Sequence, residues 1–259
     1  MRMDAARETE LTVRLRAAGC VFAEDEARLI LEAAATPAEL EALTAKRVEG
    51  VPLEHLLGFV EFHGLRIAID PGVFVPRQRT AFLVDTALAL AAPDAVVLDL
   101  CCGCGALGAA VAAALPGVEL WAADVDPRAT RNARRNIHGA GRVVTGNLFE
   151  PLPRALRGRV DIVLANTPYV PTAAIDTMPA EARLFEALVA LDGGSDGLDV
   201  QRRVAEEAPR WLSKGGHLLV EASDRQASVT AGIFDRAGLD ARIAEDDELG
   251  ATVVIGTLR

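Results

Sequence analysis

The sequence VVLDLCCGCGALG, residues 96–108, decides which fold this chain is expected to adopt. Its apolar run from Val96 to Leu100 predicts a buried strand, and the small residues that follow predict a tight turn into a helix. Gly103 and Gly105 would let the backbone of that turn approach a ligand closely, and the helix would present free N–H groups to it. A strand, a glycine-rich turn and a helix in this order are typical of a ligand-binding α/β protein.

Strands and helices alternate around this stretch and beyond it. The predicted strands are Ala95–Leu100, Val118–Ala123, Arg142–Thr145, Val160–Ala165, Gly216–Glu221, Asp240–Ala244 and Thr252–Leu258. The predicted helices are Ala106–Leu115, Pro127–Ile137, Leu198–Leu212 and Arg225–Ala237. Because several strands are continuous apolar runs, we expect a parallel sheet with helices on both faces, which is a doubly wound fold.

The amino-terminal part of the chain has a different pattern. Residues 1–58 predict a small helical domain, in which Thr36-Pro37-Ala38-Glu39 supplies the capping box of a helix that runs to about Val48. Residues 59–75 predict a β-hairpin linker, because the hydrophobic period changes towards two on either side of His63-Gly64. Residues 76–259 then form the α/β domain.

The composition agrees with a globular α/β protein. Hydrophobic residues make up 51% of the 259 residues and aromatic residues only 4%. No apolar run reaches the roughly 18 residues of a membrane span, and the amino terminus lacks the apolar stretch of a secretory signal. We therefore expect a cytoplasmic protein that does not bind membranes. A net charge of −10 argues against direct binding to nucleic acid.

Three cysteines, Cys101, Cys102 and Cys104, lie in the glycine-rich turn. They are too close together for a disulfide framework and lack the spacing of zinc ligands. We therefore predict no metal site.

The glycine turn alone leaves two cofactors open. Gly103, Gly105 and Gly108 also fit a dinucleotide fingerprint, with Asp124 where a ribose-binding acid should lie. However, Asp99 ends the strand just before the turn, where its carboxylate would repel a pyrophosphate. The same carboxylate can face the cationic amino-acid end of S-adenosylmethionine, while Asp124 accepts hydrogen bonds from the ribose hydroxyls. This arrangement favours a methyltransferase over a dehydrogenase.

A second motif, Asn166-Thr167-Pro168-Tyr169, follows the predicted strand Val160–Ala165. Loops at the carboxyl ends of strands line the ligand crevice of a doubly wound sheet. Pro168 keeps Thr167 out of helical geometry and holds its carbonyl outward. The amide oxygen of Asn166 and this carbonyl can accept both hydrogens of a substrate NH₂ group, while Tyr169 packs on its planar face. Such acceptors would draw electron density towards a poorly nucleophilic amide nitrogen and align it with the methyl donor.

These residues resemble the HemK-type protein-(glutamine-N5) methyltransferases, which modify a glutamine of peptide-chain release factors. The resemblance covers nearly the whole chain, and its motifs are Pro52–Gly58, Glu61–Leu65, Pro71–Arg77, Asp99–Gly105, Asp124, Asn136, Asn166–Tyr169 and Asp192–Asp199. It implies a helical amino-terminal domain, a hairpin and a seven-stranded Rossmann-like class I methyltransferase domain. It also implies S-adenosylmethionine as the cofactor and a protein substrate such as a release factor.

The resemblance assigns roles residue by residue. Asn166, Thr167, Pro168 and Tyr169 match the family's substrate turn and are the expected catalytic residues. Gly103, Gly105, Asp124 and Asn166 match its cofactor positions, and Leu148 takes the position near the adenine. The full expected set of cofactor residues is Asp99, Cys101, Gly103, Gly105, Asp124, Val125, Asn147, Leu148 and Asn166.

Several positions depart from the family pattern and suggest a divergent paralogue. Thr167 replaces the first proline of an Asn-Pro-Pro-Tyr turn, Arg79 stands where an acidic residue is expected, and the proline that usually follows Glu186 is missing. Two alternatives therefore stay open: an N-methyltransferase for a small molecule or another amino or amide acceptor, and a cofactor-binding module without catalysis.

Overall fold

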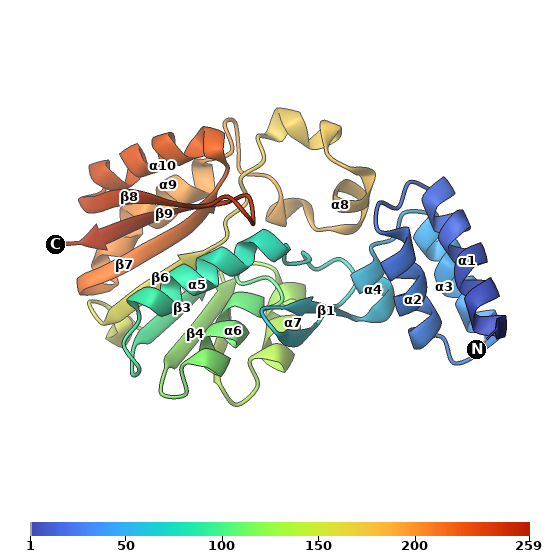
Figure 1. Cartoon of the computed structure of the whole chain (residues 1–259). Helices are drawn as coiled ribbons and strands as arrows, with labels where there is room; N and C mark the ends of the chain where they lie inside the picture. Colours follow the sequence, from blue (N-terminus) through green and yellow to red (C-terminus); the bar gives the residue numbers. More distant parts are fainter. Residues whose placement is uncertain (1) are drawn as a thin grey trace.

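The computed structural model describes residues 2–259 and places four helices at the amino-terminal end (Figure 1). Residue 1, with which the predicted helical domain begins, lies outside the described residues. The helices are α1 (Arg2–Ala17), α2 (Ala23–Ala33), α3 (Pro37–Val48) and α4 (Leu53–Leu57). They pack around a small core made by Leu11, Leu15, Ala23, Ala27, Ile30 and Leu53.

Helix α3 begins at the predicted cap. The Thr36 hydroxyl oxygen accepts a hydrogen bond from the Glu39 N–H at 3.2 Å. The Glu39 carboxylate in turn accepts from the N–H of Ala35, one residue before the cap, at 2.9 Å. Two N–H groups at this helix start are thereby satisfied, which fixes where the helix begins.

Strands β1 (Phe59–Phe62) and β2 (Leu65–Ala68) form the predicted antiparallel hairpin. His63 and Gly64 have φ values of 49° and 73°, the left-handed geometry of a two-residue hairpin turn. Helix α7 (Pro127–Asn136) holds the end of this hairpin through two asparagines. The Asn136 side chain exchanges two hydrogen bonds of 2.9 Å with the backbone of Ala68, and Asn132 donates to the same carbonyl at 2.7 Å.

The rest of the chain builds a seven-stranded sheet with the strand order β5-β4-β3-β6-β7-β9-β8. Its strands are β3 (Val96–Leu100), β4 (Glu119–Asp124), β5 (Gly141–Thr145), β6 (Val160–Ala165), β7 (Leu212–Ala222), β8 (Leu239–Asp246) and β9 (Ala251–Leu258). Strands β5, β4, β3, β6 and β7 run parallel, and β9 lies antiparallel to both of its neighbours. The sheet is therefore mixed, and its parallel part matches the predicted doubly wound fold.

Helices cover both faces of this sheet (Figure 1). They are α5 (Ala81–Leu90), α6 (Ala106–Ala114), α7 (Pro127–Asn136), α9 (Asp199–Glu207) and α10 (Asp224–Arg236), whereas α8 (Ala180–Phe185) lies apart from the sheet, towards the amino-terminal helices. Short 3-10 turns occupy Gln78–Thr80, Arg154–Leu156, Thr172–Thr177, Leu188–Ala190 and Ala208–Arg210. No helix in the described chain, residues 2–259, is both long enough and apolar enough to cross a membrane.

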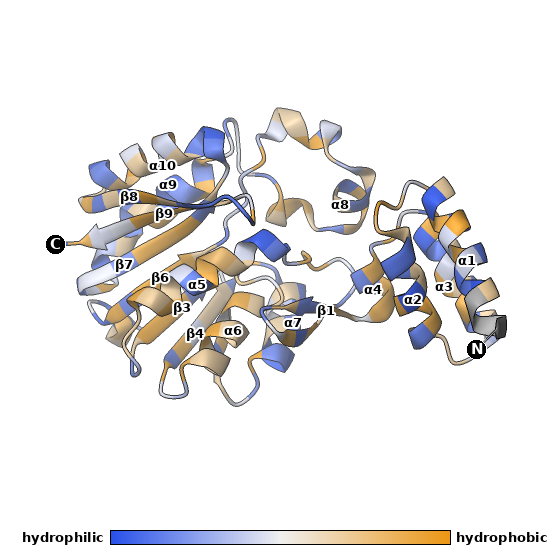
Figure 2. Cartoon of the chain, viewed as in Figure 1, coloured by the Kyte–Doolittle hydropathy of each residue, from blue (hydrophilic) through white to orange (hydrophobic). Residues whose placement is uncertain are grey.

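Two hydrophobic cores lie on opposite faces of the sheet. Because side chains alternate along a strand, Val97 contributes to one core while Val96 and Leu98 contribute to the other. The first core also takes up α5, α6 and the hairpin, and the second takes up α9 and α10. Figure 2 shows the consequence: the central strands are mainly hydrophobic, whereas hydrophilic residues are frequent on outer helices such as α10.

A buried ion pair fastens the amino-terminal helices to the rest of the molecule. The Arg47 guanidinium of α3 contacts Glu26 of α2 at 2.6 Å, and the Arg47 side chain is only 8% exposed. The same guanidinium reaches Glu181 of α8 at 3.3 Å and the Val51 carbonyl at 3.1 Å. Since Glu181 belongs to the wall of the cavity described below, the helical bundle contacts the cavity wall directly.

Candidate active site

A cavity of about 680 Å³ opens at the carboxyl ends of β3, β4 and β6. This is the edge where doubly wound sheets bind ligands, and the volume lies within the roughly 300–1,000 Å³ of typical ligand sites. The described residues, 2–259, contain no cluster of three or more His, Cys, Asp or Glu side chains that could hold a metal ion.

The glycine-rich turn after β3 forms the floor of this cavity. Gly103 has φ +54°, and no atom lies within 4 Å of the position that a Cβ would take, so it faces open space. Gly105 has φ +80°, but a Cβ there would lie 2.9 Å from Ala133 and from Ile137. Gly103 therefore keeps the cavity open, whereas Gly105 lets α6 pack against α7. Both glycines were expected to admit a ligand; in the structure Gly103 lines the cavity and Gly105 does not.

Asp99 lies beneath the turn and does not line the cavity either. It is only 1% exposed, and its Oδ2 atom accepts the N–H of Gly108 at 2.9 Å. Burial raises the pKa of this carboxyl from 3.8 to about 7, and the charge of Asp124 acts in the same direction. In this position the carboxylate supports the start of α6 and is separated from the cavity by the turn.

Asp124 at the end of β4 does line the cavity. Its Oδ2 accepts the N–H of Gly103 and its Oδ1 accepts the N–H of Asp126, each at 2.9 Å. Burial raises the pKa of this carboxyl, while the two N–H groups oppose the rise. The carboxylate is thus fixed in place and still has lone pairs for hydroxyl groups of a ligand. Val125 next to it is 49% exposed on the cavity side.

Cys101, Asn147 and Leu148 complete this end of the cavity. Burial raises the pKa of the Cys101 thiol above 9.0, so it stays protonated and acts as a small apolar surface. Asn147 accepts from Arg203 at 2.8 Å and donates to Glu150 at 2.9 Å. Leu148 is buried with φ +48°, which presents its side chain to the cavity. A flat apolar group would find suitable contacts here.

The turn Asn166–Tyr169 forms the opposite end. The Asn166 amide nitrogen lies 3.5 Å from the Thr80 hydroxyl. No residue between 2 and 259 donates a hydrogen bond to the Asn166 Oδ1 atom or to the Thr167 carbonyl. Because both residues line the cavity, these two oxygens are candidate acceptors for a ligand there. The Thr167 hydroxyl, in contrast, is buried and has no hydrogen-bond partner in the described chain.

Arg79 and Glu221, which the sequence did not place in the site, flank Tyr169. The Arg79 guanidinium donates to the Tyr169 hydroxyl at 2.5 Å and to the Glu221 carboxylate at 3.2 Å. Glu221 is the last residue but one of β7 and is 3% exposed. Its position at a strand end on the same sheet edge was the signal that could have identified it. The positive charge of Arg79 is thus balanced by a buried carboxylate.

The residues 178–191 form the remaining wall, which sequence reasoning also missed. Glu186 attaches this wall to the segment after the hairpin. Its two carboxylate oxygens accept from Arg77 at 2.8 and 2.9 Å, and one accepts the Val75 N–H at 3.3 Å. Burial raises the pKa of Glu186, and the charge of Arg77 opposes that rise.

Residues 64–196 match the family model described as the Methyltransferase small domain. A release factor glutamine methyltransferase of Geobacter sulfurreducens is 39% identical over 226 residues, covering 85% of this chain and 78% of that protein. The enzyme of the same name from Deinococcus radiodurans is 35% identical and covers 92% of both chains.

The chain belongs to the release factor glutamine methyltransferase family. These enzymes are S-adenosylmethionine-dependent protein-glutamine methyltransferases, so the predictions of family, cofactor and reaction are confirmed. The dinucleotide alternative and the non-catalytic module are excluded by the same finding. Among solved structures, a methyltransferase of Pyrococcus furiosus superposes with a TM-score of 0.57 at 18% identity, covering 84% of this chain and 98% of that one. This likeness confirms the class I methyltransferase fold.

One relative differs in its acceptor. A ribosomal protein uL3 glutamine methyltransferase of Burkholderia pseudomallei is 35% identical and covers 78% of this chain and 71% of that protein. Members of the glutamine methyltransferase family with similar identity to this chain therefore modify different translation proteins.

Proposed function

We propose that this enzyme methylates the side-chain amide nitrogen of a glutamine in a peptide-chain release factor, with Asn166 and Thr167 holding the acceptor amide. One observation carries the proposal: Asn166 and Thr167 line one cavity with Asp124 and Gly103, and within the described residues neither Asn166 Oδ1 nor the Thr167 carbonyl accepts a hydrogen bond. A primary amide has two N–H groups, so this pair of oxygens can hold both.

The other end of the cavity fits the cofactor. Asp124 would hold the ribose hydroxyls, and Leu148 and Val125 would contact the adenine. The N–H groups at the start of α6 would face the carboxylate of its amino-acid end. When bound, S-adenosylmethionine supplies the electrophilic methyl group. Cys101 and Asn147 would complete the cofactor end, whereas Asp99 and Gly105 would act indirectly, by supporting the turn.

The chain's own residues would position and activate the acceptor amide for methyl transfer. Asn166 and Thr167 polarise the amide N–H bonds and direct the nitrogen lone pair towards the cofactor end. Tyr169, held by Arg79, would pack against the planar amide. Positioning of this kind can supply several kcal/mol of rate enhancement, and about 7 in ideal cases. No general base is required, because the methylated nitrogen is transiently cationic and loses its proton readily.

We propose further that residues 1–58 form a helical domain, 59–75 a linker and 76–259 the methyltransferase domain. The separate core of α1–α4 supports the first boundary. The hydrogen bonds between Ala68 and α7 support a linker that is fixed to the catalytic part. We also propose that the enzyme acts in the cytoplasm, because its proposed substrates are translation proteins.

The test combines labelled cofactor with two proteins. Wild-type enzyme is incubated with methyl-labelled S-adenosylmethionine and either a release factor or ribosomal protein uL3, and the added methyl group is mapped by mass spectrometry. We expect label on a release factor glutamine. Label on uL3 alone, or on neither protein while a small amide is methylated, would overturn the proposed acceptor.

A matched pair of variants tests the residue roles. Asn166→Ala should lower kcat by about 100-fold or more, the scale for loss of one positioned hydrogen-bonding group, while cofactor binding stays measurable. Asn147→Ala makes the same chemical change at the other end and should raise KM for S-adenosylmethionine with little effect on kcat. Asp124→Ala should mainly weaken cofactor affinity. Full activity of Asn166→Ala, or an unchanged cofactor Kd in Asp124→Ala, would refute these assignments.

A further inference from the structure

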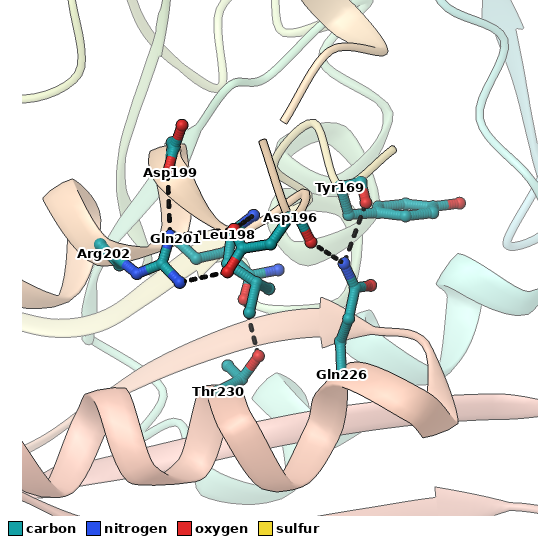
Figure 3. A network of polar contacts seen from close by, with 8 residues as sticks. All are labelled: Tyr169, Asp196, Leu198, Asp199, Gln201, Arg202, Gln226 and Thr230. Carbon is teal, nitrogen blue, oxygen red and sulfur yellow. Dashed lines mark hydrogen bonds and ion pairs between the residues drawn. The ribbon is translucent and has the colours of Figure 1, made fainter. Parts of the chain in front are cut away.

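We propose that Gln226 of α10 is a positioning residue that fixes the acceptor turn through the main chain of Tyr169. Figure 3 shows Gln226 reaching from α10 to the carbonyl oxygens of Tyr169 and Asp196. Gln226 does not line the cavity, so it would act on the reaction only through the turn. This inference rests on the proposed role of Asn166 and Thr167.

The hydrogen bonds of Gln226 determine which way its amide points. Its Nε2 donates to the Tyr169 carbonyl at 3.0 Å and to the Asp196 carbonyl at 3.2 Å. Its Oε1 accepts from the Ser223 hydroxyl at 2.7 Å. Because a carbonyl oxygen can only accept, the nitrogen must face Tyr169 and Asp196. Both of its hydrogens are thus committed to main-chain carbonyls.

Among the described side chains, those of residues 6–259, no other one hydrogen-bonds to the main chain of residues 166–169. Immediately after the turn, Val170 is anchored on both sides. Its N–H donates to Leu191 at 3.1 Å, and its carbonyl accepts from Gly193 at 2.8 Å. The strand β6 fixes the turn at its start, and Gln226 together with Val170 fixes it at its end. The acceptor oxygens lie between these two anchors.

The segment 192–199 packs closely against the turn. A Cβ on Gly197 would lie 2.2 Å from the Tyr169 carbonyl oxygen and 2.6 Å from the Gln226 amide nitrogen. A Cβ on Gly193 would lie 2.7 Å from the Pro168 carbonyl oxygen. Loss of the Gln226 hydrogen bond would remove one of the contacts that fix the direction of the Tyr169 carbonyl. A shift of that carbonyl changes the direction of the preceding acceptor oxygens.

Side chains of α9 and α10 hold this segment in turn (Figure 3). Arg202 donates to Asp196 and to Asp199, each at 2.9 Å. The Thr230 hydroxyl donates to Gln201 at 2.8 Å across the α9–α10 contact. Gln226 therefore joins a supported framework to the turn, which is the arrangement expected of a positioning residue.

Replacing Gln226 by glutamate reverses the interaction without changing the shape of the side chain. An ionised carboxylate would face two carbonyl oxygens and repel both, whereas a protonated carboxyl can donate to one of them. We expect the kcat of Gln226→Glu to fall about 10- to 100-fold at about pH 8, the scale of an ångström-size misplacement. It should recover relative to wild type as the pH falls towards the range in which the new carboxyl protonates, with an unchanged Kd for S-adenosylmethionine. Gln226→Met should lose kcat at every pH.

Gln78→Glu is the matched control. Gln78 also donates to a main-chain carbonyl, that of Glu61, at 2.7 Å, but it is exposed and does not contact the turn. This control should keep wild-type kcat. A folded Gln226→Glu enzyme with wild-type kcat at every pH, or with the same fractional loss at every pH, would overturn the proposal.

A second readout does not depend on the acceptor. Tyr169 is the only tyrosine of the chain, so labelling with carbonyl-¹³C tyrosine gives a single NMR signal from the turn. That signal should shift in Gln226→Met and stay in place in Gln78→Glu. An unchanged signal in Gln226→Met would also overturn the proposal. Full activity of Asn166→Ala would refute the proposed role of the turn itself. If Asn166→Ala is inactive and the Gln226 variants keep wild-type kcat, only the role of Gln226 is refuted.

Discussion

Replacing the buried carboxyl of Asp99 by an amide should make the protein more stable, and increasingly so as the pH rises. The Asp99 side chain is only 1% exposed, and its one hydrogen bond is from the Gly108 N–H at 2.9 Å. Burial raises its pKa from 3.8 to about 7. An asparagine oxygen can accept the same N–H bond, so Asp99→Asn should preserve the turn.

The direction in which pH changes the stability follows from the proton that Asp99 takes up on folding. Between about pH 3.8 and pH 7 the carboxyl is protonated in the folded chain and ionised in the unfolded chain. Folding takes up a proton in this window, so this group's contribution to stability is complete below pH 3.8 and is lost as the pH rises towards 7. Since one pH unit corresponds to about 1.4 kcal/mol, the full loss is about 4 kcal/mol, of which about 2 kcal/mol falls between pH 5 and pH 7.

Thermal and urea unfolding of both proteins at pH 5, 6, 7 and 8 would measure this effect. The stability gap between Asp99→Asn and wild type should widen by about 2 kcal/mol from pH 5 to pH 7, or by about 4–8 °C in Tm for a chain of this size. The buried amide's own cost does not depend on pH, so the change in the gap is the quantity to follow. Parallel pH curves for the two proteins would refute the assignment of a raised pKa to Asp99.

The same variant tests the role that the sequence suggested for Asp99. If this carboxylate faced the cationic end of the cofactor, its replacement would weaken the binding of S-adenosylmethionine by about tenfold or more. Because the structure places it beneath the turn, we expect the cofactor Kd of Asp99→Asn to stay within about threefold of wild type. A tenfold loss of cofactor affinity, measured by calorimetry, would instead support direct contact between Asp99 and the cofactor.

Two further outcomes follow from the site. Thr167→Val removes a buried hydroxyl that has no partner in the described chain, so the free energy of unfolding should rise by about 1 kcal/mol while kcat is retained. A loss of kcat would show that the acceptor or cofactor uses this hydroxyl. Gly105→Ala should lower stability by about 2 kcal/mol or more, because its Cβ would meet Ala133 at 2.9 Å in a left-handed backbone. Gly103 faces open space, so Gly103→Ala should weaken cofactor binding more than Gly105→Ala does. Equal cofactor affinities of the two variants in calorimetry would contradict the different roles of the two glycines.

The sequence predicted the central strands well because their signals are local. The prediction for Val160–Ala165 was correct at both ends, and that for Ala95–Leu100 differed by one residue. Strand β7 begins at Leu212, four residues before the predicted Gly216. Gly215 and Gly216 resemble a turn in sequence, but they belong to an irregular strand in which the pairing with β6 shifts register.

The helices were harder to predict where periodicity is weak. Helix α5 (Ala81–Leu90) was not predicted, because most of its residues are apolar and no polar face marks it as amphipathic. Helix α9 ends at Glu207, not at the predicted Leu212. Pro209 lacks the N–H that would continue the helix, so the chain continues as a short 3-10 turn.

Site residues, like the helices and strands, could be predicted from sequence only where their signals are local. Strand-end positions such as Asp124 and Asn166 could be placed from sequence, since the ends of parallel strands meet at one edge. Contacts between distant segments could not be placed. Gln226 is 57 residues from Tyr169 in the chain, and the glutamine–carbonyl contact leaves no periodic or spacing signal. Only the folded structure identifies it.

Arg79 shows how a sequence difference can be misread without its partner. On its own, an arginine where the family has an acidic residue suggests a more positive acceptor site. In the structure the guanidinium is paired with the Glu221 carboxylate, which is 3% exposed and would otherwise be a buried unpaired charge. The pair adds no net charge, and its main contribution to the site is the hydrogen bond to the Tyr169 hydroxyl. Both ends of Tyr169 are therefore held, the hydroxyl of the ring by Arg79 and the main chain by Gln226. The arginine at position 79 thus affects the position of the turn more than the electrostatic field around it.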